Sequence, residues 1–343
     1  FTHGSDAKVT SLVRHVVMFT LILESVGAAL LFIRFSTMYP PGRALYYSVF
    51  HAISAFCNAG FSLFSESFMN FKNDPLVNLT VCSLIITGGL GFLVLVELKR
   101  LFLSPRNPRQ VRRLSVHSKL VLSLSFLLLF TGTLGFIILE WRSSMVGLSV
   151  PTKIISSFFQ SVTTRTAGFN TLDFSKMANV TLLFSIFLMF IGAASGSTGG
   201  GIKVNTLGVL FALSRSRLRG EETTNIFRRT LAPASVGRAI AVFTVSVVVI
   251  SIATMALMAS ELGTTPHGES RGLFLELLFE IVSAFGTVGL SVGVTRTLST
   301  MGKVIIILVM FIGRLGPLSI ALALSRRPSR ARYRYAEENV MIG

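Results

Sequence analysis

Charged residues are scarce in this 343-residue sequence, and acidic residues are the scarcest of them. Asp, Glu, Lys and Arg together make up 14% of the chain, whereas a soluble domain carries about a quarter of such residues. Hydrophobic residues make up 51%, and the mean hydropathy is +0.69. This composition excludes an ordinary soluble protein and indicates a chain built mainly from membrane-embedded helices.

The sequence also lacks the residue clusters that catalytic and metal sites need. Its two cysteines, Cys57 and Cys82, are too far apart to form a metal-binding pair and indicate no disulfide framework. The five histidines form no cluster, and neither paired carboxylates nor a nucleophile–base arrangement occurs. We therefore do not expect an enzyme, an organic cofactor or a nucleotide-binding motif in this chain.

The net charge of +17 could serve nucleic-acid binding or a membrane surface. The basic residues cluster in short segments between long apolar runs, near 99–119, near 214–238 and after residue 325. This distribution argues against a nucleic-acid partner. Cytoplasmic loops of membrane proteins carry an excess of Lys and Arg. The basic segments therefore predict a multi-pass protein in contact with membrane lipid, with both ends of this chain in the cytoplasm.

Two classes of apolar stretch alternate along the chain. About 20 apolar residues are needed to span a bilayer, and six stretches qualify: 12–34, 76–98, 117–140, 179–213 (interrupted), 236–260 and 302–324. Three shorter stretches lie between successive pairs, at 43–56, 152–164 and 269–285, and each ends in a polar loop with glycine. We expect these to be half-helices that enter the membrane and return as extended chain.

The half-helices end in three related segments, which make this sequence a repeat protein. The segments are FHAISAFCNAGFS (50–62), FQSVTTRTAGFN (159–170) and FEIVSAFGTVGLS (279–291). The sequence therefore predicts an all-α membrane protein in which a helix, a half-helix with its loop and a second helix occur three times. The expected division is 1–11 cytoplasmic, 12–100 one repeat, 101–116 basic loop, 117–214 a further repeat, 215–235 cytoplasmic, 236–325 the last repeat and 326–343 a cytoplasmic tail.

The chemistry of such a repeat suits a dehydrated alkali cation. Backbone carbonyls in a ring replace the hydration shell without fixed charge, and glycine adopts the backbone angles that turn carbonyls toward an axis. Nine residues are candidate ligands, mainly through their carbonyls: Asn58, Ala59, Gly60, Thr166, Ala167, Gly168, Thr287, Val288 and Gly289. The alternative is that the three glycines only permit close helix packing. Their equivalent places in three units favour the ion site.

The fourth apolar stretch is broken by a glycine-rich segment at 192–203, GAASGSTGGGIK. Each glycine costs a helix about 1 kcal/mol relative to alanine, so an intramembrane loop or a flexible kink is expected. A phosphate-binding P-loop does not fit, because Ile202 separates the last glycine from the lysine and no strand precedes the segment. Arg314 lies near the middle of the expected last span, where an unpaired arginine is costly. It should face the pore or a buried acceptor.

These features resemble the Trk/Ktr/HKT superfamily of potassium transporters, and most closely the bacterial Ktr membrane subunit. The resemblance rests on AFCNAGFS, TRTAGFN and SAFGTVGLS, on GAASGSTGGGIK and on the closing RYAEENVMIG. It implies four repeats around one pseudo-fourfold cation pore, with a selectivity filter in which Gly60, Gly168 and Gly289 belong to repeats two, three and four. No earlier repeat precedes residue 12, so we expect the first repeat to be missing and this chain alone not to conduct.

The resemblance also implies a mechanism and partners. Potassium would be taken up across the bacterial plasma membrane through the filter, and the 192–203 loop would act as a gate. The gate residues would be Ser195, Gly196, Ser197, Thr198, Gly199, Gly200, Gly201, Lys203 and Arg314. A homodimer and a cytoplasmic nucleotide-binding regulatory ring are expected, the latter in contact with Glu221–Pro233 and Tyr333–Gly343. The alternatives are a sodium-permeable or ion-coupled secondary transporter, although the repeats run in the same direction and their loops lack carboxylates.

Overall fold

The computed structural model describes residues 3–102, 113–266 and 268–316 of the chain. Within them it is almost entirely helical, with eleven α-helices, three short 3-10 helices and one two-stranded hairpin. In chain order the elements are α1 (His3–Phe35), α2 (Pro41–Phe56), η1 (Met69–Phe71), α3 (Pro75–Leu90), α4 (Phe92–Phe102), α5 (Val116–Glu140), α6 (Val150–Thr163), η2 (Phe174–Lys176), α7 (Asn179–Phe190), α8 (Val204–Leu218), β1 (Asn225–Ile226), β2 (Arg229–Thr230), α9 (Pro233–Leu262), α10 (Leu273–Phe285), η3 (Val294–Arg296) and α11 (Thr300–Leu315).

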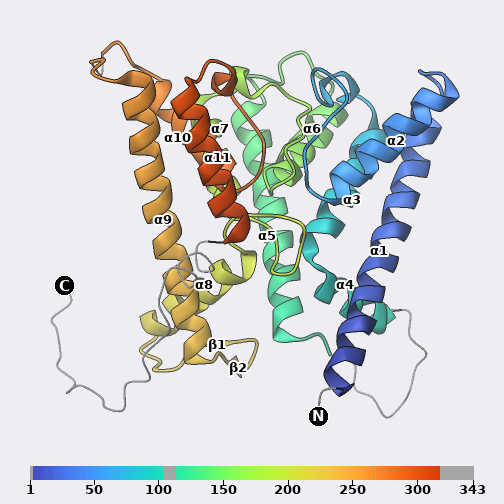
Figure 1. The fold of residues 1–343 in the computed structure, drawn as a ribbon, viewed down its shortest axis with the longest axis vertical. Coiled ribbons are helices and arrows are strands. Elements are labelled where there is room, and N and C mark those ends of the chain that lie inside the picture. Colours follow the sequence, from blue (N-terminus) through green and yellow to red (C-terminus); the bar gives the residue numbers. More distant parts are fainter. Residues whose placement is uncertain (1–2, 103–112, 267, 317–343) are drawn as a thin grey trace.

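Three groups of elements share one order: a long helix, a short helix, an extended loop and a returning helix. We call them the α1–α3, α5–α7 and α9–α11 units. The short helices α2, α6 and α10 gather toward one end of the molecule, and α8 with the β1–β2 hairpin lies at the other end (Figure 1). Each short helix is packed against the returning helix of the preceding unit where there is one, α6 against α3 and α10 against α7.

The helix starts follow from local sequence. Asp74, Ser115, Ser149 and Ser299 precede α3, α5, α6 and α11, and each side chain accepts a hydrogen bond from a backbone N–H in the first turn. Such caps satisfy donors that a helix start otherwise leaves unpaired. Proline stands in the first turn of α2, α3, α6 and α9, where its missing N–H costs nothing.

Two expected spans differ from the structure. The stretch 76–98 is not one straight helix, because α3 and α4 meet at an angle of 102°. Gly91 at this break has φ +85°, and a methyl group there would lie 3.0 Å from the carbonyl oxygen of Ser195. The chain therefore turns where the 192–203 loop approaches it. Within the expected span 302–324, helix α11 ends at Leu315 with Gly316 at φ +84°, and residues 317–324 lie outside the described residues.

Long apolar helices in the described residues number fewer than the six expected spans. Val13–Phe35, Val116–Glu140 and Pro233–Leu262 are long and apolar enough to cross a membrane, and the bent α3–α4 pair could make a fourth. Helices α7 and α11 are shorter. Most of the expected basic loop at 101–116 and all of the tail at 326–343 lie outside the described residues.

Two hydrophobic cores share the central unit. One joins α1, α2 and α3 to α6 and the loop that follows it, through residues that include Phe35, Phe159 and Phe169. The other joins α5 and α7 to α9, α10 and α11, through residues that include Phe136, Phe279 and Phe285. The α5–α7 unit therefore couples its two neighbours, and the three short helices are held in fixed relation to one another.

Each long helix is also fastened to the start of the returning helix of its own unit. Glu140 at the end of α5 accepts hydrogen bonds from the Ala178 backbone N–H (3.0 Å) and the Thr181 hydroxyl. Glu261 near the end of α9 accepts from the backbone N–H of Ser299 (3.0 Å). In the α1–α3 unit the polarity is reversed, and Arg34 forms an ion pair with the capping residue Asp74. All three contacts hold the two ends of a unit together around its half-helix.

Candidate ion-binding site

The three predicted filter segments come together in the structure, although they are more than a hundred residues apart in sequence. A methyl group added to Gly60 would lie 2.6 Å from the carbonyl oxygen of Ala167 and 3.0 Å from the Cα of Gly168. One added to Gly168 would lie 2.3 Å from the carbonyl oxygen of Val288. One added to Gly289 would lie 3.7 Å from the Cα of Gly168. Backbone from three units therefore meets at these glycines, with carbonyl oxygens facing the neighbouring segment.

The backbone conformation is the same in all three segments. Gly60, Gly168 and Gly289 have φ between +72° and +88°, and the residues two positions earlier, Asn58, Thr166 and Thr287, also have positive φ, from +49° to +69°. This left-handed region is unfavourable for residues with a Cβ, and most of all for β-branched threonine. Backbone strain held at the same place in three units is typical of a functional site.

Hydroxyl groups at the end of each half-helix hold this strained chain. Ser54 donates to the carbonyl of Phe61 (2.8 Å), Thr163 to that of Phe169 (2.5 Å) and Ser283 to that of Leu290 (2.6 Å). Each acceptor directly follows the filter glycine. In the α5–α7 unit the loop is one residue shorter, since Thr163 and Phe169 are six residues apart rather than seven. In each unit, the Ser or Thr at this equivalent position therefore closes the filter loop of its own unit.

The glycine-rich segment forms a loop between α7 and α8, as expected for an interrupted span. Its two ends are joined where the Gly192 N–H donates to the Ile202 carbonyl (2.8 Å). Its tip touches all three units: the Thr198 hydroxyl donates to the carbonyl of Phe56 (3.1 Å), at the end of α2. A methyl group on Gly199 would lie 2.3 Å from Thr166 Oγ1, and one on Gly200 would lie 2.1 Å from Thr287 Oγ1. The loop thus packs directly against the candidate ion site.

Contacts from outside the loop hold it in place. The Ala194 N–H donates to the carbonyl of Gly89 (3.0 Å) and the Thr198 N–H to that of Gly88 (3.3 Å), both in α3. Within the loop, Lys203 Nζ donates to the carbonyls of Gly199 (2.6 Å) and Gly200 (3.2 Å). The lysine charge is therefore directed at carbonyls of the tip. Most of these partners are backbone groups of a few glycines.

Arg314 contacts this loop from the last turn of α11. Its side chain is exposed, and its Nη1 donates to the carbonyl of Thr198 (2.7 Å). The second half of the expected span, from residue 317, lies outside the described residues, and the backbone acceptor expected for the arginine is present. All predicted gate residues lie in this loop or in contact with it.

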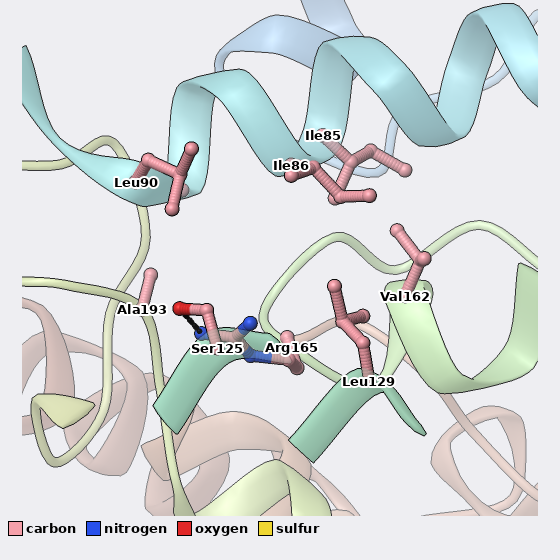
Figure 2. Close-up of a pocket in the computed structure, with 9 residues that line it drawn as sticks. Ile85, Ile86, Leu90, Ser125, Leu129, Val162, Arg165 and Ala193 are labelled. Atoms are coloured by element: carbon pink, nitrogen blue, oxygen red, sulfur yellow. Dashed lines mark hydrogen bonds between the residues drawn. The ribbon is translucent and has the colours of Figure 1, made fainter. Parts of the chain in front are cut away.

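Sequence reasoning missed Arg165, in the middle of the second filter segment. Its side chain is buried between α3, α5 and α6, beside a small cavity, and its Nη2 donates to the hydroxyl of Ser125 (3.1 Å; Figure 2). Its Nε has no hydrogen-bond partner among the described residues. The signal was available, because a charged residue expected at membrane depth is as costly here as at Arg314.

Comparison with known proteins gives a consistent result. The family model for TrkH, described as a cation transport protein, matches residues 4–335. The Ktr system potassium uptake protein B of Bacillus subtilis (strain 168) is 39% identical over 98% of this chain and 72% of its own length. The protein of the same name from Vibrio alginolyticus is 40% identical over 97% of this chain and 70% of its own length.

Two further proteins extend the comparison. The potassium/sodium uptake protein NtpJ of Enterococcus hirae is 36% identical over 98% of this chain and 72% of its own length. Among solved structures, the potassium transporter TrkH of Vibrio parahaemolyticus superimposes with a TM-score of 0.71 at 18% identity. That match covers 93% of this chain and 65% of the solved one, so the chain spans just under two thirds of that transporter.

Proposed function

Because this chain belongs to the TrkH family of cation transport proteins, we propose that it forms most of a potassium uptake pore, with the backbone carbonyls of its three filter segments as ion ligands. The observation that carries the proposal is the meeting of Gly60, Gly168 and Gly289, with the Ala167 and Val288 carbonyls facing their neighbours. Carbonyl dipoles are the groups that replace the hydration shell of potassium in selective pores.

The half-helices support ion binding at the same point. The C-terminal ends of α2, α6 and α10 lead directly into the filter segments, and such ends carry partial negative charge. Three half-helices directed at one place lower the free energy of a cation there without a carboxylate ligand. This arrangement separates the proposal from an ion-coupled solute transporter, which usually has a charged midplane site.

One side of the ion site is open between the first and the last segment. A cavity there is lined by Asn58 and Ala59 from one unit and by Thr287, Val288 and Gly289 from another. We infer that a fourth unit of the same kind stands on this side in the complete pseudo-fourfold pore. That inference agrees with the four repeats that the family resemblance implies.

We further propose that the 192–203 loop is the gate. It touches all three filter segments and is held by hydrogen bonds to α3 and by Arg314. A loop fastened by few contacts can leave the pathway at moderate cost. While it is in place, Arg314 and Lys203 also put positive charge next to the route of a cation.

The regulatory partner would bind at the opposite end of the molecule. The β1–β2 hairpin lies there, within the expected contact segment Glu221–Pro233, and Phe227 at its turn is 45% exposed. Phe227 and Arg228 both have positive φ, a conformation that non-glycine residues adopt at a cost. The other expected contact, Tyr333–Gly343, lies outside the described residues. A nucleotide-binding cytoplasmic ring and a homodimer remain predictions.

Uptake of labelled rubidium by vesicles that contain the full-length gene product tests the function. We expect uptake that potassium competes for and sodium does not. Uptake competed equally by sodium would instead support the sodium-permeable alternative. No cation uptake, with the protein inserted and folded, would contradict the proposed pore.

A further inference from the structure

The residue after the phenylalanine of each filter motif accepts hydrogen bonds from the outgoing chain in two units, but not in the third. His51, Gln160 and Glu280 each follow the phenylalanine that begins a filter motif, and all three side chains are buried. They lie three to five residues before the end of their half-helix, and therefore precede the ion ligands in sequence. Their hydrogen bonds show what the position does.

In the α1–α3 unit, His51 holds the chain that leaves the filter. Its Nε2 accepts the backbone N–H of Leu63 (3.2 Å) and lies 3.2 Å from the hydroxyl of Ser62. Its Nδ1 lies 2.7 Å from the carbonyl of Tyr47 and therefore carries the proton. The imidazole is neutral in this arrangement, and its ring stacks on Phe64 with centroids 4.6 Å apart.

In the α9–α11 unit, Glu280 makes the matching contacts. Its Oε1 accepts from the hydroxyl of Ser291 (2.5 Å) and the backbone N–H of Val292 (3.2 Å). Ser62 and Ser291 both lie two residues after the filter glycine, and Leu63 and Val292 lie three after it. The imidazole of His51 and the carboxylate of Glu280 thus accept hydrogen bonds from equivalent hydroxyl and backbone N–H groups of their own units. Glu280 also accepts from Thr295 (2.5 Å).

In the α5–α7 unit the position is unused. The amide nitrogen and oxygen of Gln160 are buried and have no hydrogen-bond partner in the described residues. The same is true of the hydroxyl of Thr171, three residues after Gly168. The chain that leaves this filter segment is held from the neighbouring unit instead. The Phe68 N–H donates to the carbonyl of Asn170 (3.0 Å), and the Asn170 N–H donates to Ser67 Oγ (3.2 Å).

We propose that His51 and Glu280 are positioning residues for ion selectivity, which fix the outgoing chain of the first and last filter segments, and that Gln160 is not. The inference rests on the proposed function. In the first and last segments the half-helix itself supplies the acceptor for the outgoing chain. In the middle segment that support comes from the hydrogen bonds between Asn170 and the neighbouring unit. What matters at the two outer positions is a hydrogen-bond acceptor rather than a charge.

The test compares leucine and glutamine at these positions in the full-length gene product, with the ratio of rubidium to sodium uptake in vesicles as the readout. Leucine removes the acceptor, and losing a buried hydrogen bond of this kind should lower the ratio about fivefold in His51→Leu and in Glu280→Leu. His51→Gln and Glu280→Gln keep an oxygen in reach of the same N–H, so both should stay within about twofold of wild type. Insertion and folding are checked by the thermal unfolding midpoint of each purified variant.

Gln160→Leu is the matched control, since it replaces a side chain of similar size at the equivalent position. It should leave the uptake ratio unchanged and should not lower the unfolding midpoint, because two buried unpaired polar atoms are removed. The inference is overturned if Gln160→Leu lowers the ratio as much as the other two leucine variants, or if Glu280→Gln is as defective as Glu280→Leu. Failure of the wild type to take up rubidium would count against the proposed function instead.

Discussion

The filter segments and the glycine-rich loop are both built from glycine and small polar residues, yet they are held in opposite ways. Each filter segment is closed by a hydroxyl of its own half-helix, as Ser54 closes onto Phe61. The loop at 192–203 is held largely by other elements, through Gly88 and Gly89 of α3 and Arg314 of α11. A locally fastened segment keeps its shape when its neighbours move. A segment fastened by distant residues moves when those residues do.

This difference matches the two tasks that we propose. An ion ligand must keep its carbonyls in place while ions pass, whereas a gate needs two arrangements of similar free energy. Glycine and small polar residues therefore form a rigid structure in the filter segments and a movable one in the 192–203 loop. What decides between them is where the hydrogen-bond partners come from.

We expect the largest loss of rubidium uptake from a substitution at Gly168. In Gly168→Ala the methyl group would meet the Val288 carbonyl at 2.3 Å and the Gly60 Cα at 3.2 Å, so backbone from three units must shift. Rubidium uptake should fall to the level of empty vesicles. Gly147→Ala is the control, because Gly147 has a similar φ of +81° with no atom within 4 Å of the added methyl. Equal losses in both variants would show that strain alone, and not the meeting of the segments, is responsible.

Removing the arginine that holds the loop should have the next largest effect. Arg314→Ala deletes the hydrogen bond to the Thr198 carbonyl, and a hydrogen bond to a charged group contributes about 1.5–3 kcal/mol. The initial rate of rubidium uptake should rise at least about threefold, with its ratio to sodium uptake unchanged. Arg296→Ala, which removes an exposed arginine of η3, is the control for lost charge. A rate that does not rise, or a changed ratio, contradicts the role of Arg314.

The smallest effect is expected from a single hydroxyl of the filter. Ser54→Ala removes the bond to the Phe61 carbonyl, which is worth about 1 kcal/mol, so the rubidium-to-sodium ratio should fall by a factor of about two to five. Ser48→Ala provides a close match, since Ser48 is also a buried serine of α2 but bonds only within the helix, to Ala44. If both variants leave the ratio unchanged, the hydroxyl does not hold the filter.

The same difference explains how much could be predicted from sequence. The short helices α2, α6 and α10 and the positive-φ glycines that follow them were predictable because each is encoded by a short local pattern that recurs three times. The bend at Gly91 was not, since it depends on the approach of Ser195 from a distant segment. The break after Leu315 at Gly316 was not predictable either, because apolar residues continue the hydropathy pattern past it.

Residues that work by long-range contact were the hardest to find. The charge of Arg165 was visible in the sequence, but its partner Ser125, forty residues away, could not be identified there. The shared position of His51 and Glu280 was visible as a polar residue after phenylalanine. The role of this position could not be predicted, because an imidazole and a carboxylate share no sequence signal. The structure shows that each accepts the equivalent backbone N–H of its own unit.

The most direct test of the account is deletion of Ser195–Gly201 from the full-length gene product, with rubidium and sodium uptake measured in the same vesicles. We predict that rubidium uptake becomes faster while the rubidium-to-sodium ratio stays that of the wild type, because the loop is removed and the locally fastened filter segments remain. Faster uptake with the ratio lost would show that the loop also shapes the filter. Unchanged uptake in a folded, inserted protein would contradict the assignment of this loop as the gate.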